Sequence, residues 1–192
     1  MPEVYVSVDI EADGPIPGVN SMLSLGAAAF RRGSVVPVAT FEVNLAPLEG
    51  AGQHPDTMAW WARFPEAWAH VTHEPREPAE AMAEFAAWTR ALPGKPVMVV
   101  YPSWDFMWVH WYLQRFTGGS PYGIGALDLK SMLFANGQVS ESFRGTAKRR
   151  MPRRWFRGAP KHTHKALDDA IGQGVLFVRA LQEIRGAQNG PG

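Results

Sequence analysis

The sequence predicts a mixed α/β domain in which helices cover the faces of a central sheet. Segments with strand character come first, helical segments follow, and a further short apolar strand lies between two of the helices. Chains with this order bury their apolar faces by packing helices against a sheet. With 192 residues, 46% of them hydrophobic, the chain is long enough and apolar enough to form one domain with a real core.

The first three strands are expected to form an antiparallel meander. Residues 3–10 alternate between apolar and other side chains, which is the period of a strand with one buried face. Its apolar members are Val4, Val6, Val8 and Ile10. Residues 23–30 and 35–45 form the next two strands, and a turn at Arg31-Arg32-Gly33 joins them.

The remaining elements alternate between helices and short strands. We expect helices at 55–71 and 78–92, a buried strand at 96–101, a helix at 104–116, a short strand at 126–129 and a last helix at 165–185. The first two of these helices carry a proline near their start, where a missing N–H costs little. Residues 136–163 show no clear period. We expect one domain over residues 1–186 and a flexible tail over 187–192.

The composition excludes several classes of protein. The chain has no cysteine, which rules out a disulfide scaffold and a zinc–thiolate site. No stretch approaches the roughly 20 apolar residues that span a bilayer. The first residues carry acids and lack a long apolar run, so they do not form a signal peptide. We therefore expect a soluble, cytoplasmic protein without membrane contacts.

One concentrated basic segment interrupts an otherwise acidic chain. Residues 144–161 hold eight lysines and arginines and no acid, which leaves 11 bases against 18 acids elsewhere. Such a local cluster favours binding of a polyanion, although the net charge of +1 conceals it. A solvated loop without a specific role is the alternative.

Acidic residues follow three of the expected elements. Asp9 and Glu11 lie two apart on the first strand and should project from one face, where a divalent cation would offset their repulsion. Asp105 follows the strand at 96–101, where open α/β sheets bind ligands. His164 and Asp169 stand at the start of the last helix. Taken singly, each has an ordinary alternative, such as a solvated acid or an acid that stabilises a helix N-terminus.

Together the three segments resemble the DEDDh group of 3′–5′ exonucleases, which includes proofreading subunits, oligoribonuclease and ribonuclease T. The matching motifs, in the family's order, are VSVDIEADG, VVYPSWDFMW and HTHKALDDA. The resemblance spans residues 6–170. It implies a ribonuclease-H-like fold with a five-stranded mixed sheet flanked by helices.

The resemblance also implies a role for each site residue. Asp9 would bridge two divalent cations, Mg²⁺ or Mn²⁺, Glu11 and Asp169 would complete the first site, and Asp105 would hold the second ion through water. Carboxylates suit these hard ions. His164 would be the general base. His162 is the alternative base, and the H-x4-D spacing favours His164 over it.

The implied function is two-metal hydrolysis of single-stranded DNA or RNA from the 3′ end, with release of nucleoside 5′-monophosphates. Two alternatives stay open: a non-catalytic nucleic-acid-binding module of the same fold, and a phosphodiesterase for very short RNA or nucleotides. The oligomeric state is also open, with a homodimer as one option.

Candidate nucleic-acid contacts come from two parts of the chain. Gly14 ends the first motif, Met22 follows the loop after it, and Ser103 stands near Asp105 in a stretch where the family often has asparagine. The basic segment offers cations for phosphates and an aromatic ring for stacking on bases. These residues are Lys148, Arg149, Arg150, Arg153, Arg154 and Trp155. Trp60 and Trp61, at helical positions, are expected to pack in the core or between helices.

Overall fold

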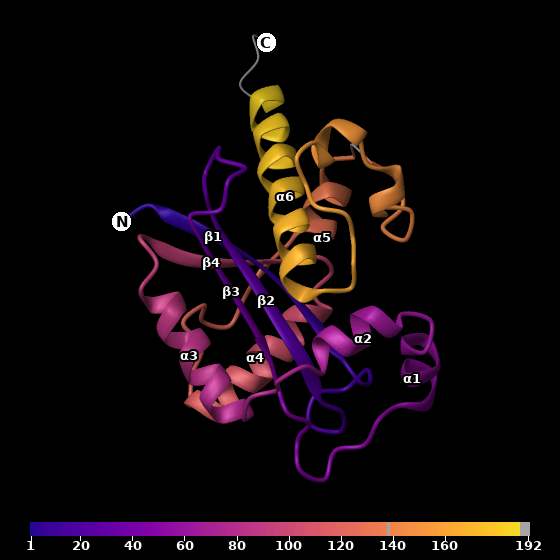
Figure 1. The fold of residues 1–192 in the computed structure, drawn as a ribbon. Helices are drawn as coiled ribbons and strands as arrows, with labels where there is room; N and C mark the ends of the chain where they lie inside the picture. The colour runs from indigo at the N-terminus through magenta and orange to yellow at the C-terminus, as the bar shows by residue number, and fades with distance from the viewer. Residues whose placement is uncertain (138, 189–192) are drawn as a thin grey trace.

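The computed structural model describes residues 1–137 and 139–188 and contains a mixed sheet with helices on both faces (Figure 1). The five strands are β1 (Glu3–Ala12), β2 (Met22–Arg31), β3 (Ala39–Asn44), β4 (Lys95–Val100) and β5 (Leu127–Asp128). Their order across the sheet is β3-β2-β1-β4-β5. The first three strands pair antiparallel, whereas β4 is parallel to β1 and β5 is parallel to β4. The predicted five-stranded mixed sheet flanked by helices is confirmed.

The helices lie in two layers and an outlying arm. They are α1 (Pro55–Trp61), α2 (Pro65–Val71), α3 (Pro78–Arg90), α4 (Trp104–Thr117), α5 (Leu129–Ala135) and α6 (Ala166–Gln188). Helices α3 and α4 cover one face of the sheet, α6 crosses the other, and α1 and α2 form the arm at one end (Figure 1). No helix in the described part of the chain is long and apolar enough to cross a membrane.

The two faces of β1 belong to two separate cores. The apolar face that includes Val4 and Val8 packs against α3 and α4, as the alternation predicts. The opposite face, which begins with Tyr5, packs against α6. Because side chains alternate along a strand, Asp9 and Glu11 also lie on the face that α6 covers.

Helix α6 sits unusually close to the sheet. Nε2 of Gln173 donates hydrogen bonds to the backbone oxygens of Val8 and Val99, at 3.1 and 3.3 Å, and so ties the helix to β1 and β4. A Cβ atom on Gly174 would lie 2.0 Å from the ring of Phe30, so no larger residue fits there without movement. These contacts hold the middle of α6 against β1, β2 and β4.

The structure differs from the predicted elements in several places. The expected helix at 55–71 is two helices, because Phe64 precedes a proline and adopts a non-helical φ of −130°. The expected strand at 35–45 begins only at Ala39. Helix α5 was not predicted, and the basic segment contains two short 3₁₀ helices, Lys148–Arg150 and Arg153–Phe156. Helix α6 extends to Gln188 within the expected tail, and residues 189–192 of that tail lie outside the described residues.

Candidate active site

Three elements bring the predicted acidic residues to one edge of the sheet. Asp9 and Glu11 stand at the carboxyl end of β1, Asp105 lies in the first turn of α4 just beyond β4, and Asp169 lies in the first turn of α6. Carboxylate oxygens of Asp9, Glu11 and Asp169 lie within 4.8 Å of one another. The Ile10 backbone and the charge of Asp9 both influence the pKa of Asp105, so Asp105 lies near the same end of β1.

Burial of these carboxyl groups makes their charged forms costly. Burial and the neighbouring Asp169 raise the pKa of Asp9 to about 7. Burial, followed by the charges of the other three acids, raises the pKa of Glu11 to about 10. The pKa of Asp105 is also raised well above its usual value, by burial and by Asp9. The cluster therefore lacks positive charge for the number of carboxylates it contains.

The donor set fits hard divalent cations. Every ligand atom that Asp9, Glu11, Asp105 and Asp169 offer is a carboxylate oxygen, and Mg²⁺ and Mn²⁺ prefer such oxygens to sulfur or imidazole nitrogen. A divalent cation would supply the charge that the buried cluster lacks.

The loop before α6 is fastened to Asp169. The backbone N–H groups of Thr163 and His164 donate to its two carboxylate oxygens, at 3.2 and 3.1 Å. His162 Nδ1 lies 2.8 Å from Oδ1 of the same carboxylate. His164 adopts a positive φ of 56°, a strained conformation for a residue other than glycine. Asp169 thus orders both histidines in addition to facing the other acids.

The two histidine rings lie in different surroundings. The His164 ring packs against Trp60 and Phe64, with centroid separations of 4.8 and 4.4 Å. Burial and the neighbouring His162 lower the pKa of His164. The hydrogen bond to Asp169 raises the pKa of His162, whose side chain is 61% exposed. Both rings offer a nitrogen within 4.8 Å of the Asp169 carboxylate, so the geometry keeps both candidate bases at the site.

Solved structures of exonucleases share this fold. The nuclease domain of 3′hExo, a DEDDh family member bound to rAMP, superposes with a TM-score of 0.70 at 12% identity, covering 94% of this chain and 92% of that one. Escherichia coli exonuclease I in complex with a dT13 oligonucleotide gives a TM-score of 0.71 at 13% identity, covering 97% of this chain and 42% of that one.

The sequence itself has a relative of clear similarity, although no family model matches it. The 3′–5′ DNA exonuclease Cap18 of Escherichia coli is 33% identical over 179 residues, which cover 91% of this chain and 90% of that protein. The chain belongs to the DEDDh family of 3′–5′ exonucleases. The predicted family is thereby confirmed.

A cavity of about 440 Å³ opens beside the acids of the exonuclease. Its lining consists of Glu11, Ala12, Gly14, Pro15, His54, Asp56, Thr57, Trp60 and Trp104. Gly14 therefore lies next to the acidic cluster, as the sequence suggested. Trp60 also lines this cavity and touches His164, so the prediction that it serves only for packing is incomplete, whereas Trp61 is buried as expected. Adjacent helical residues point about 100° apart, so the two rings meet edge to face, with centroids 4.9 Å apart, while only Trp60 reaches the cavity.

Two predicted nucleic-acid contacts are wrong because the side chains are buried. Met22 is fully buried, and its N–H donates to the Tyr112 hydroxyl at 2.7 Å. Trp155 is 1% exposed, and its Nε1 donates to Glu183 at 2.8 Å, so its ring cannot stack on a base. Arg154 is exposed but pairs with Glu183.

The other predicted contacts are accessible. Ser103 is exposed immediately before α4, two residues from Asp105. The basic segment also exposes Arg149, Arg150 and Arg153, so phosphates can reach them, and their contacts stay predictions. Lys148 differs from these arginines because it is half-buried.

Proposed function

We propose that this exonuclease removes nucleotides from the 3′ end of single-stranded DNA by two-metal hydrolysis and releases nucleoside 5′-monophosphates. The observation that carries the proposal is that carboxylate oxygens of Asp9, Glu11 and Asp169 lie within 4.8 Å of one another, with Asp105 close enough for the charge of Asp9 to raise the pKa of Asp105. A module that only binds nucleic acid gains nothing from buried, mutually repelling carboxyl groups, and their retention argues against that alternative.

The arrangement of the acids suggests how they would share two ions. Asp9 lies close to Glu11 and Asp169, and it is the acid whose charge raises the pKa of Asp105. Asp9 would therefore bridge both ions, Glu11 and Asp169 would complete one site, and Asp105 would serve the other. When bound, two such cations activate a water molecule and balance charge on the phosphate.

His164 is our candidate for the general base that accepts the proton of the attacking water. Trp60 and Phe64 hold its ring, and Asp169 holds its backbone. A base must be close to the water and neutral before transfer. His162 is less suitable because its hydrogen bond to Asp169 raises its pKa, which favours the protonated ring over the neutral one.

The cavity beside Glu11 would receive the terminal nucleoside. Trp60 and Trp104 line it, and aromatic rings bind unpaired bases by stacking without requiring a particular sequence. The exposed arginines of the basic segment would neutralise phosphates farther along the strand. We favour DNA over RNA because the relative at 33% identity is named a DNA exonuclease. Action in the cytoplasm by a domain of residues 1–186 is part of the same proposal.

An assay with 5′-labelled single strands tests this function. Matched DNA and RNA oligomers would be incubated with Mg²⁺ or Mn²⁺, and with EDTA as the control. A ladder that shortens from the 3′ end, faster for DNA and absent in EDTA, is the expected result. Binding without any metal-dependent cleavage would contradict it and favour the binding module. Cleavage restricted to dinucleotides would favour a phosphodiesterase for very short substrates.

A further inference from the structure

One lysine of the basic segment, Lys148, lies between residues that are packed into the core. Lys148 begins the first 3₁₀ helix, between the buried residues Thr146 and Met151. The Tyr101 hydroxyl donates to the Thr146 carbonyl oxygen at 3.1 Å, which joins this segment to the end of β4. Trp155 anchors the segment again in the core beside α6. The position of Lys148 is therefore set by the fold, unlike that of a lysine on a free loop.

Lys148 faces the acidic cluster. It lines a small cavity of about 80 Å³ together with His162, Asp169 and Gln173. Its Nζ lies 5.2 Å from the centroid of the Tyr101 ring, at the end of β4 from which Asp105 also follows. Its charge is the largest influence that opposes the raised pKa values of Asp9 and Asp105. The cavity shared with Asp169 and the influence on Asp9 and Asp105 together place Lys148 beside the proposed metal-binding carboxylates.

In the proposed reaction, one more positive charge near the phosphate would stabilise the transition state. The charges of four ionised carboxylates and two divalent cations cancel, and a phosphodiester then adds one negative charge. Attack by hydroxide raises that charge further in the transition state. A preorganised donor at this point binds the transition state more tightly than the ground state, and this difference is what accelerates a reaction.

We propose that Lys148 is a further catalytic residue, whose ammonium group donates a hydrogen bond to a non-bridging oxygen of the scissile phosphate. This inference rests on the proposed two-metal function. Lys148 would thus act on the reacting phosphate, whereas the exposed Arg149 and Arg153 would contact phosphates farther along the strand. Without substrate, Lys148 offsets part of the charge of Asp9 and Asp105.

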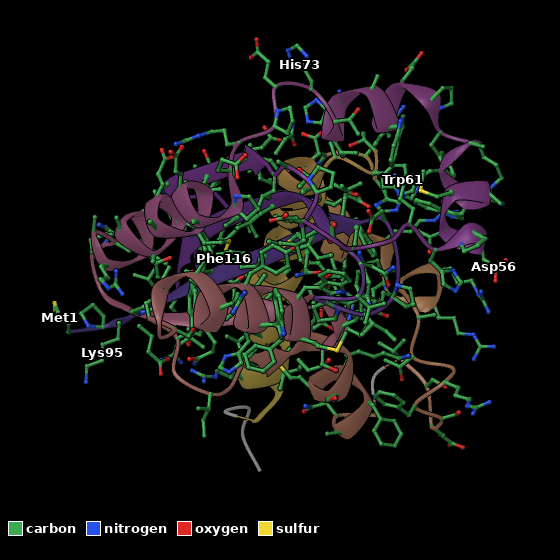
Figure 2. All side chains as sticks on the ribbon, turned by 90° about the horizontal axis from the view of Figure 1, so that it is seen from below. Met1, Asp56, Trp61, His73, Lys95 and Phe116 are labelled. Carbon is green, nitrogen blue, oxygen red and sulfur yellow. The ribbon has the colours of Figure 1, made fainter. Side chains whose placement is uncertain are left out.

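Steady-state kinetics on a single-stranded oligonucleotide provide the first test. Lys148→Gln should lower kcat by about 100-fold, the usual cost of losing one preorganised donor, with a smaller change in KM. Lys148→Arg keeps the charge and should retain more of kcat than Lys148→Gln. The matched control is Lys95→Gln. Lys95 is exposed at the start of β4 and lies across the molecule from Asp56 of α1 (Figure 2), so both constants should stay unchanged.

Titration with Mn²⁺ alone provides a second test that does not depend on turnover. Removing a cation beside the site should tighten Mn²⁺ binding by at least about twofold in Lys148→Gln, because like charges repel. Lys148→Met, which keeps the apolar stem, should show the same gain if the glutamine variant folds poorly. Unchanged Mn²⁺ affinity together with wild-type kcat overturns the role of Lys148. A wild-type protein that binds Mn²⁺ but cleaves no strand overturns the proposed function instead.

Discussion

Gly26 of β2 lies directly beneath Ala166 at the start of α6. A Cβ atom at position 26 would come within 2.2 Å of the Ala166 carbonyl carbon. Gly26 pairs with Asp9 across the antiparallel ladder between β1 and β2. The missing side chain therefore lets the first turn of α6, which carries Asp169, descend onto the end of β1 where Asp9 stands.

Gly26→Ala should damage both stability and activity. The contact is with backbone atoms, so α6 must move as a whole, and overpacking of this kind costs about 1–3 kcal/mol or more. Displacing Asp169 by about 1 Å relative to Asp9 is expected to lower kcat by about 100-fold. Urea unfolding and cleavage of a 5′-labelled strand would measure the two effects.

Gly119→Ala is the matched control for that variant. A Cβ atom at position 119 meets nothing within 4 Å. Its stability should stay within about 0.5 kcal/mol of the wild type, as for most surface substitutions, with activity unchanged. Equal behaviour of the two alanine variants would show that α6 does not depend on Gly26.

Local pattern was sufficient to predict the sheet and the main acids. The alternation from Val4 to Ile10 identified β1, and the same period of two placed Asp9 and Glu11 together on the opposite face. The order of the three motifs, which matches that of the family, then predicted that Asp105 and Asp169 share this site. The strand and the shared position of the acids were predictable because each depends on spacing within one element or on a known family order.

Long-range packing was not predictable from local pattern. Trp155 lies in a basic segment that looks solvated, yet its nitrogen bonds to Glu183, 28 residues later in the chain. Met22 is buried beneath Tyr112, 90 residues away. Helix α5 has only seven residues, too few to show a helical period. For Trp155 and Met22, the partner that decides the environment is absent from the local sequence.

Asp9→Asn should abolish cleavage and also the stabilisation that Mn²⁺ gives the folded protein. Asp9 faces the other carboxylates, so its loss removes a ligand from both proposed metal sites. A ligand that binds only the folded state raises the melting temperature, and the measurement compares melting with Mn²⁺ and with EDTA. Glu80→Gln, which removes an exposed carboxylate on α3, should keep both properties. Retained Mn²⁺-dependent cleavage in Asp9→Asn would exclude Asp9 as a metal ligand.

His164→Ala should slow cleavage by about 100-fold or more, the usual contribution of a general base. Affinity for Mn²⁺ should change little, because the carboxylates supply the ligands. His162→Ala should have the smaller effect on kcat, since the bond to Asp169 raises the pKa of this ring and favours its protonated form. Single-turnover rates on one labelled strand would compare the two variants. The opposite ranking would make His162 the base.

The metal-free protein should lose stability as pH rises from about 5 to about 8. The pKa of Glu11 is raised to about 10 and that of Asp9 to about 7, so the folded state keeps protons that the unfolded chain releases above pH 4 to 5. The unfolded state then binds fewer protons, and the free energy of unfolding falls with rising pH.

The lowered pKa of His164 changes stability with pH in the opposite direction, near the usual pKa of histidine. Comparison of the wild type with Glu11→Gln removes this effect, because His164 is the same in both proteins. Urea unfolding in EDTA at several pH values should give a flatter profile for Glu11→Gln than for the wild type. Mn²⁺ should restore more stability at pH 8 than at pH 6, since its ligands must first lose their protons. Identical profiles for the two proteins in EDTA would mean that Glu11 is not held in its protonated form by the fold.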